Sequence, residues 1–303
     1  AGTACQAGHM TDPTPPLRYP PRDLGDAWVV APSGERYWGR FGAAGLLAVD
    51  DRRGVLLQHR ASWSHHGDTW GVPGGALHKH EPAVQAALRE ASEEAGVPID
   101  AVRPWLTDVA DREVWSYTTV VAQVVTPFEA TISDPESLDL AWVPVDEVTR
   151  LPLHSGFAAS WGRLRGLLAV RPVIVVDAAN VVGSVPDGWW RDRPGAASRL
   201  LTRLATLATT GVPAGALELP GHTWFTDWAV VLEGQARAAA DVPGLQVVRA
   251  DAGGDDRIVH EAELLRAGGR PVTAVTSDRG LTERLERLGA TVRTAGWLLD
   301  QFS

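Results

Sequence analysis

Residues Gly75–Val97 read GALHKHEPAVQAALREASEEAGV, and this stretch decides the fold of the first half of the chain. It predicts a helix over about 81–95, because apolar residues recur at helical spacing and a glycine follows. Glu90, Glu93 and Glu94 have the spacing i, i+3 and i+4, which places three carboxylates on one helix face. The opposite, apolar face consists of Val84, Ala87, Leu88, Ala91 and Ala95.

Three neighbouring carboxylates repel one another unless a cation lies among them. An all-oxygen cluster suits Mg²⁺, which keeps several waters and also takes phosphate oxygens as ligands. The loop Gly71–Gly75 precedes the helix and can bring backbone carbonyls close to the same ion. A bare E-x-x-E-E pattern is more often a solvated helix face, so these three residues alone do not decide between the two interpretations.

The longer pattern around these residues decides between the two interpretations. Its seven fixed letters are Gly75, Glu81, Arg89, Glu90, Glu93, Glu94 and Gly96. At ordinary residue usage such a set matches by chance on the order of once in 10⁸ positions. The pattern resembles the Nudix box, G-x5-E-x7-R-E-U-x-E-E-x-G-U, where U is apolar. Ala91 is smaller than the usual residue at its U position, and we expect it to loosen packing without affecting the chemistry. The likeness extends over about residues 38–165 and includes Leu57-Gln-His-Arg60 and Thr69–Gly75.

The resemblance implies an α/β/α sandwich with a mixed sheet that hydrolyses a nucleoside diphosphate linked to another group. It implies Mg²⁺, or Mn²⁺, as cofactor. The implied metal ligands are Glu90, Glu93, Glu94 and the carbonyl of Gly75. Arg89 would orient a carboxylate, Arg60 would contact substrate phosphate, and Glu93 or Glu94 would act as general base.

The substrate stays open among a damaged nucleoside triphosphate, ADP-ribose, a dinucleotide and an RNA 5′ end. Four aromatic residues could stack on a base or could instead pack in the core: Trp63, Trp70, Trp115 and Tyr117. His65-His66 could contact phosphate or form a surface turn.

The second half alternates strands with helices. Expected strands lie at about 173–176, 229–232, 246–249 and 272–275, and expected helices at about 195–208, 255–267 and 280–288. This alternation predicts a parallel sheet with helices on both faces. We place the boundary near 169–172, which gives domains at 23–168 and 172–303.

Acidic residues follow the strands of this second half. Asp177 ends the first strand, Asp255-Asp256 opens a helix, and Asp278 ends a later strand. The carboxyl ends of parallel strands share one edge, where ligands bind, so these acids could form a magnesium site. Each acid alone is more often a helix cap, and Asp278 is a plausible one.

Over about residues 172–302, the sequence motifs of these segments resemble those of the NYN branch of the PIN-like nucleases. Members of that branch carry similar V-D-x-x-N-V, A-D-D-x-I and V-T-S-D-R motifs. The resemblance implies a Rossmann-like, PIN-like fold. It implies metal ligands Asp177, Asp256 and Asp278, supported by Asn180, with Asp255 as a further candidate. Gly254 replaces the usual Ala, and Glu233-Gly234 stands where Asp-Gly is common, which leaves open whether the domain cleaves RNA or binds it.

Composition bounds the remaining expectations. Net charge is -9, without the broad basic excess of proteins that bind nucleic acid non-specifically. Residues 1–22 look like a cloning remnant before Met10, which is the sole Met, followed by a Pro-rich lead-in. The sole Cys lies in that remnant.

The arginine-rich composition suggests a bacterial source. We expect a cytoplasmic enzyme with a small nucleotide substrate and no membrane association, while the oligomeric state stays open. The competing account is an RNA-processing or RNA-binding protein that uses both domains.

Overall fold

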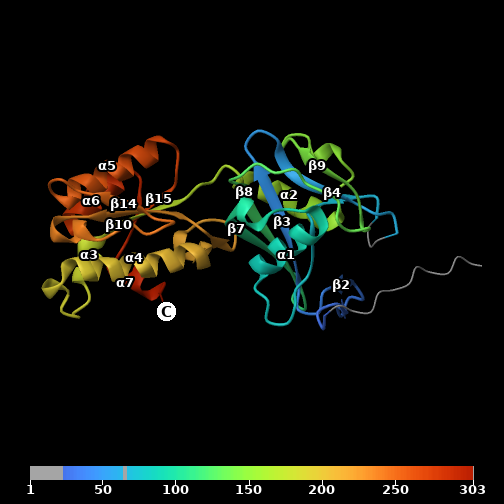
Figure 1. The fold of residues 1–303 in the computed structure, drawn as a ribbon, viewed down its shortest axis with the longest axis horizontal. Helices are drawn as coiled ribbons and strands as arrows, with labels where there is room; N and C mark the ends of the chain where they lie inside the picture. The colour runs from blue at the N-terminus through green and yellow to red at the C-terminus, as the bar shows by residue number, and fades with distance from the viewer. Residues whose placement is uncertain (1–22, 64–66, 303) are drawn as a thin grey trace, which may run out of the picture.

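The computed structural model describes residues 23–63 and 67–302, and Figure 1 shows them as two lobes. The first lobe, blue to green, is formed mainly by the first half of the chain, and the second lobe, yellow to red, mainly by the second half. The expected remnant, the Pro-rich lead-in and His65-His66 lie outside the described residues.

The first lobe is built on a mixed sheet. Its strands are β3 (Ala43–Asp50), β4 (Gly54–Arg60), β5 (Trp70–Gly71), β6 (Gly74–Ala76), β7 (Val102–Asp111), β8 (Ser116–Val124) and β9 (Ser137–Val143), beside a separate hairpin of β1 (Trp28–Val30) and β2 (Arg36–Trp38). β3 pairs in parallel with β8, whereas its pairing with β4 and β6 is antiparallel. The predicted mixed sheet is therefore confirmed.

Helices α1 (Ala83–Ala95) and α2 (Ser155–Leu167) cover opposite faces of this sheet. Successive side chains of a strand point to opposite faces. Leu46 and Ala48 of β3 accordingly lie in a cluster with the alanines of α1. Leu47 and Val49 lie in another cluster with Trp161 and Leu164 of α2. This alternation produces the expected α/β/α sandwich.

The second lobe holds a five-stranded sheet in the order β14-β13-β10-β15-β16, in which every pairing is parallel. The strands are β10 (Val173–Asp177), β13 (Asp227–Leu232), β14 (Gln246–Arg249), β15 (Val272–Val275) and β16 (Thr291–Arg293). The helices are α3 (Ala178–Gly183), α4 (Arg193–Thr210), α5 (Gly254–Ala267), α6 (Arg279–Arg287) and α7 (Ala295–Asp300). Residues of α5 and α6 pack on one face, and those of α3, α4 and α7 on the other, as predicted (Figure 1).

The remaining elements are short. The 3-10 helices are η1 (Ile99–Ala101), η2 (Val148–Arg150), η3 (Trp189–Arg191), η4 (Ala214–Leu217) and η5 (Gly234–Ala238). Within residues 23–63 and 67–302, no helix combines the length and the apolar character that crossing a bilayer requires.

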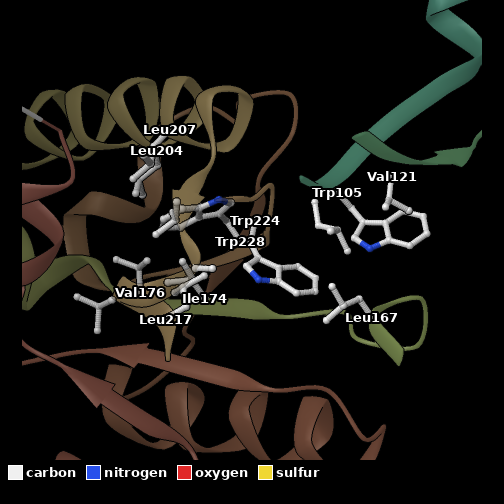
Figure 2. Packing of buried hydrophobic residues seen from close by; sticks show 14 of the residues in the cluster. Trp105, Val121, Leu167, Ile174, Val176, Leu204, Leu207, Leu217, Trp224 and Trp228 are labelled. Carbon is white, nitrogen blue, oxygen red and sulfur yellow. The ribbon is translucent and has the colours of Figure 1, made fainter. Parts of the chain in front are cut away.

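The two lobes share a sheet and a core. Strands β11 (Val212–Pro213) and β12 (Thr223–Trp224) come from the second half of the chain, yet β12 pairs with β7 of the first lobe. One hydrophobic cluster includes Trp105 and Leu167 of the first lobe with Trp224 and Trp228 (Figure 2). The chain therefore does not divide cleanly at 169–172, because the segment around 212–224 completes the edge of the first sheet.

This shared core predicts cooperative unfolding. Trp224 is fully buried and donates a 2.8 Å hydrogen bond from Nε1 to the carbonyl of Pro220. Trp224→Ala should lower the free energy of unfolding by about 3–5 kcal/mol, as large-to-small core substitutions do. Urea denaturation should show a single transition that shifts as a whole. The control Trp190→Ala removes a tryptophan that is 56% exposed and should change little. Two separate transitions in the wild type would contradict this prediction.

Candidate active site

Two positions just before α1, Gly74 and Gly75, leave little room for a side chain. β6 pairs with β3 through Gly74 and Gly75, which lie opposite Gly45 and Ala44. A methyl group on Gly74 would lie 2.4 Å from the carbonyl oxygen of Ala44, and one on Gly75 would lie 2.6 Å from the Glu90 carboxylate. Such separations are well below van der Waals contact, so this backbone can pass under the carboxylates of α1 only without side chains.

Helix α1 lies close to the sheet because its buried face is made of alanines. It begins after Pro82 and ends at Gly96, whose φ of 61° is left-handed, as the predicted glycine stop requires. Ala91 is fully buried in a cluster with Ala44 and Ala48 of β3. The expectation that Ala91 loosens packing is therefore wrong, because small residues on both elements allow a close approach.

Arg89 holds the acidic groups of the site in place. Its Nε and Nη2 each donate a 2.9 Å hydrogen bond to the Glu81 carboxylate, and Nη1 contacts Glu90 at 2.7 Å and Glu93 at 3.4 Å. Nη2 also donates to the carbonyl of Ala76 at 3.1 Å. The hydrogen bonds from Arg89 lower the pKa of Glu81. Arg89 therefore connects Glu81, which lies just before α1, to Glu90 and Glu93 within the helix.

The three predicted carboxylates have different surroundings. Glu93 has a side chain 54% exposed, whereas Glu94 is buried and accepts a 2.9 Å hydrogen bond from the Gly74 N–H. Burial, and next the charge of Glu90, raise the pKa of Glu94 to about 8. Burial likewise raises the pKa of Glu90. The competing interpretation of a solvated helix face does not hold for Glu94, because α1 turns that position toward the β6 backbone.

These groups suit a hard cation. Within the part of the chain that the structure describes, no three His, Cys, Asp or Glu side chains are arranged to hold a metal ion as they lie. The partly buried Glu90 nevertheless acts on the buried Glu94, whose pKa burial and then the charge of Glu90 raise. The backbone of Gly75 approaches the Glu90 carboxylate closely. Carboxylate and backbone oxygens gathered in this way fit Mg²⁺ or Mn²⁺.

Two further predicted residues lie near this pair. The positive charge of Arg60, at the end of β4, lowers the pKa of Glu94. The hydroxyl of Tyr117 lies directly over Gly45, where a methyl group would come within 2.1 Å of it. Burial, and next the charge of Glu94, raise the pKa of Tyr117. Both residues therefore border the acidic centre.

The other aromatic candidates differ in their contacts. Trp63 is 60% exposed, and Trp70 is stacked on His59 with ring centroids 4.8 Å apart. Trp115 is stacked on Tyr37 of β2 at 4.8 Å and donates from Nε1 to the carbonyl of Trp38 at 3.1 Å. Sequence reasoning missed this β1–β2 hairpin, although the paired WVV and RYW segments indicate short strands.

The second set of acids surrounds the carboxyl ends of β10 and β15. Asp177 accepts from the Asn180 N–H at 3.0 Å and from the Thr276 hydroxyl at 2.9 Å, and the Asn180 side chain accepts from the Ser277 N–H at 2.8 Å. Asp278 accepts from the Leu281 N–H at 2.8 Å and caps α6. Asp177 caps α3 in the same way. The cap interpretation is confirmed for both.

The structure brings together a different set from the one predicted. Burial raises the pKa of Asp255, followed by the charges of Asp278 and Glu233. Glu233 also accepts a 2.8 Å hydrogen bond from the Gly254 N–H. Asp256 instead forms a 2.7 Å ion pair with Arg284 and has a side chain 84% exposed. The next position on a helix points about 100° away, so Asp256 faces Arg284, and its role as a metal ligand stays a prediction. Glu233, noted only as an unusual residue, belongs near the group.

Comparison with known proteins identifies the first lobe. Residues 39–162 match the family model described as NUDIX domain. The chain is 50% identical over 166 residues to the putative 8-oxo-dGTP diphosphatase 3 of Mycobacterium tuberculosis, a match that spans 52% of this chain and 76% of the relative. It is 37% identical over 152 residues to a nucleoside triphosphate pyrophosphatase/Nudix hydrolase fusion protein of Bifidobacterium longum, covering 48% of this chain and 32% of that one. The crystal structure of a Nudix hydrolase from M. smegmatis, RenU, is 48% identical and covers 48% of this chain and 96% of its own, with a TM-score of 0.44.

The raised pKa of Glu94 predicts a pH-dependent stability. The folded, metal-free protein keeps a proton up to about pH 8, whereas the unfolded chain releases it near the ordinary value of 4.5. In a chelator, stability should therefore fall as pH rises from about 4.5 to about 8. Glu94→Gln cannot ionise, so its melting temperature should exceed that of the wild type at pH 8, and the difference should vanish toward pH 4.5. Glu93→Gln, on the same helix but exposed, is the control. Equal melting temperatures for the two variants at the upper pH would contradict the assignment.

Proposed function

The chain belongs to the Nudix family and is a hydrolase acting on phosphoric anhydride bonds; from this premise we propose that it is a Mg²⁺- or Mn²⁺-dependent pyrophosphohydrolase of nucleoside triphosphates. The observation that carries the proposal is the Arg89–Glu90–Glu94 arrangement beside Gly74 and Gly75. For the substrate, we propose an oxidised purine nucleotide such as 8-oxo-dGTP. The support is the similarity to the M. tuberculosis relative, a putative 8-oxo-dGTP diphosphatase.

In the proposed site, Glu90, Glu93, Glu94 and the Gly75 carbonyl would hold the metal. When bound, it supplies positive charge that neutralises the phosphate oxygens and promotes attack by water. Arg89 keeps Glu81 and Glu90 in position, and Arg60 would bind a phosphate oxygen. Of the two candidate bases, Glu94 is supported better, because the Gly74 N–H holds its carboxylate in place whereas the Glu93 side chain is 54% exposed.

The nucleobase would lie against the aromatic hairpin. Gly39, which follows β2, approaches the backbone of Ala76 so closely that a methyl group would lie 3.4 Å from its Cα. Ala76 is also where Arg89 donates its hydrogen bond. The stacked pair Tyr37 and Trp115 therefore stands beside the acidic centre. Flat aromatic rings of this kind bind bases by stacking.

The catalytic role of Glu94 is tested by turnover. Glu94→Gln should lose at least about 10²-fold in kcat with saturating Mg²⁺, the lower range for a group that transfers a proton or holds the metal. Glu263→Gln, exposed on α5, is the matched control and should keep wild-type turnover. Near-native turnover of Glu94→Gln on the best substrate would remove Glu94 from the site.

A substrate screen tests the substrate proposal. The purified full chain with Mg²⁺ or Mn²⁺ should be assayed against 8-oxo-dGTP, dGTP, ADP-ribose, dinucleotides and 5′-triphosphorylated RNA. The proposal expects the highest kcat/KM for 8-oxo-dGTP, with release of pyrophosphate. Preference for ADP-ribose or a dinucleotide would refute the substrate while leaving the hydrolase chemistry in place.

For the second lobe, we propose a PIN-like domain that binds a divalent metal and acts as a nuclease. Four acids at the edge formed by β10 and β15 support it. After burial, the charges of Asp255 and Glu233 raise the pKa of Asp177, and those of Asp278 and Glu233 raise the pKa of Asp255. Nearby arginines are already engaged: Arg199 pairs with Asp187 at 3.7 Å, and Arg257 with Glu261 at 2.6 Å. The competing account, in which both lobes act on one RNA, has less support for this reason.

Metal-dependent melting tests this lobe. Mn²⁺ should raise the melting temperature of the full chain, because a ligand bound only by the folded state stabilises it. Asp278→Asn should reduce that rise while keeping the α6 cap, since Asn caps as well as Asp. Asp256→Asn, the control, should leave the rise unchanged, because Asp256 pairs with Arg284 instead. Equal rises in both variants would contradict a metal site here.

A further inference from the structure

A cavity of about 360 Å³ opens where the two lobes meet. Its charged lining comes from both lobes and the segment between them: Arg103 of β7, Arg171 of the connecting segment, Asp227 at the start of β13 and Arg270 before β15. Gln123 of β8 and the glycines that follow α5 complete the wall. The volume lies within the range of small-molecule binding sites.

Positive charge is in excess in this cavity. Asp227 is the sole carboxylate among the lining residues, and it pairs with Arg103 at 3.3 Å and also with Arg270. Arg171 forms no ion pair within the described residues. Its guanidinium lies 3.6 Å from the centre of the Trp105 ring and donates to the carbonyl of Leu168 at 2.7 Å. Burial lowers the pKa of Arg171. The charges of Asp51 and Asp227 act against this shift, and those of Arg270 and Arg103 act in the same direction as burial.

The cavity is separate from the acidic centre. Gln123 and Tyr117 are both on β8, six positions apart, so at about 3.3 Å per residue roughly 20 Å of strand lies between them. An arginine cluster at that distance from the carboxylates of α1 takes no part in the chemistry there. The cavity is partly open, and its volume of about 360 Å³ suits a small ligand.

We propose that this cavity binds a phosphate-bearing small anion. Guanidinium groups bind phosphate through paired N–H donors, and three of them with one carboxylate leave two positive charges for the ligand. Since Arg103 belongs to the first lobe and Arg270 to the second, the bound anion contacts both and stabilises their junction.

Two variants with opposite effects test the proposal. Arg103→Gln removes a cation that is 60% exposed, whereas Asp227→Asn removes the carboxylate that competes with the ligand. The melting temperature of the full chain is measured in EDTA with increasing pyrophosphate, against NaCl at equal ionic strength. We expect a saturable rise for the wild type, a smaller rise for Arg103→Gln and a larger one for Asp227→Asn. Arg150→Gln is the matched control, since Arg150 forms a similar exposed ion pair with Glu147 and should respond as the wild type does.

The source of the phosphate is distinguished by comparing pyrophosphate with inorganic phosphate and with a nucleoside monophosphate. A steeper response to the monophosphate identifies a nucleotide ligand, and equal responses identify a free phosphate anion. Turnover without added anion should be the same for Arg103→Gln and the wild type. The proposal is overturned if no anion produces a rise, or if Arg103→Gln and Asp227→Asn respond as the wild type does.

Discussion

The hydrogen bond from the Gly74 N–H to the buried Glu94 carboxylate connects the sheet of the first lobe to its acidic helix. It forms only because α1 lies very close to β3 and β6, which in turn requires alanines on the helix and glycines on the strands. Larger residues would separate the two elements and leave Glu94 without its donor. The electrostatics of the site therefore depend on the absence of side chains as much as on the carboxylates.

The same closeness explains how the buried Glu94 lies near the partly buried Glu90. A buried charge without a partner is costly, and the protein lowers that cost through the Gly74 N–H and the charge of Arg60. Arg89 does the same for Glu90 and at the same time fixes Glu81. Even so, Glu90 and Glu94 each hold a proton more tightly than an ordinary glutamate does.

Local patterns predicted the elements that are themselves local. Helix α1 with its glycine stop and the parallel sheet of the second lobe followed from periodicity and turn residues. Strand β7 was missed because Pro104 interrupts it, and the structure places a register shift there. The burial of Glu94 and the ion pair of Asp256 with Arg284 were missed for another reason. Each depends on which neighbour a helix faces, and helical spacing alone does not specify that neighbour.

The pairing of β12 with β7 also has a consequence for synthesis on the ribosome. Thr107 pairs with Thr223, so the partner of this edge emerges about 116 residues later. At about 5–20 residues per second, the delay is roughly 6–23 s. During that time β7 is an open edge, and such edges pair readily with other strands. Slow translation between the two lobes therefore lengthens the period in which the nascent first lobe is open to aggregation.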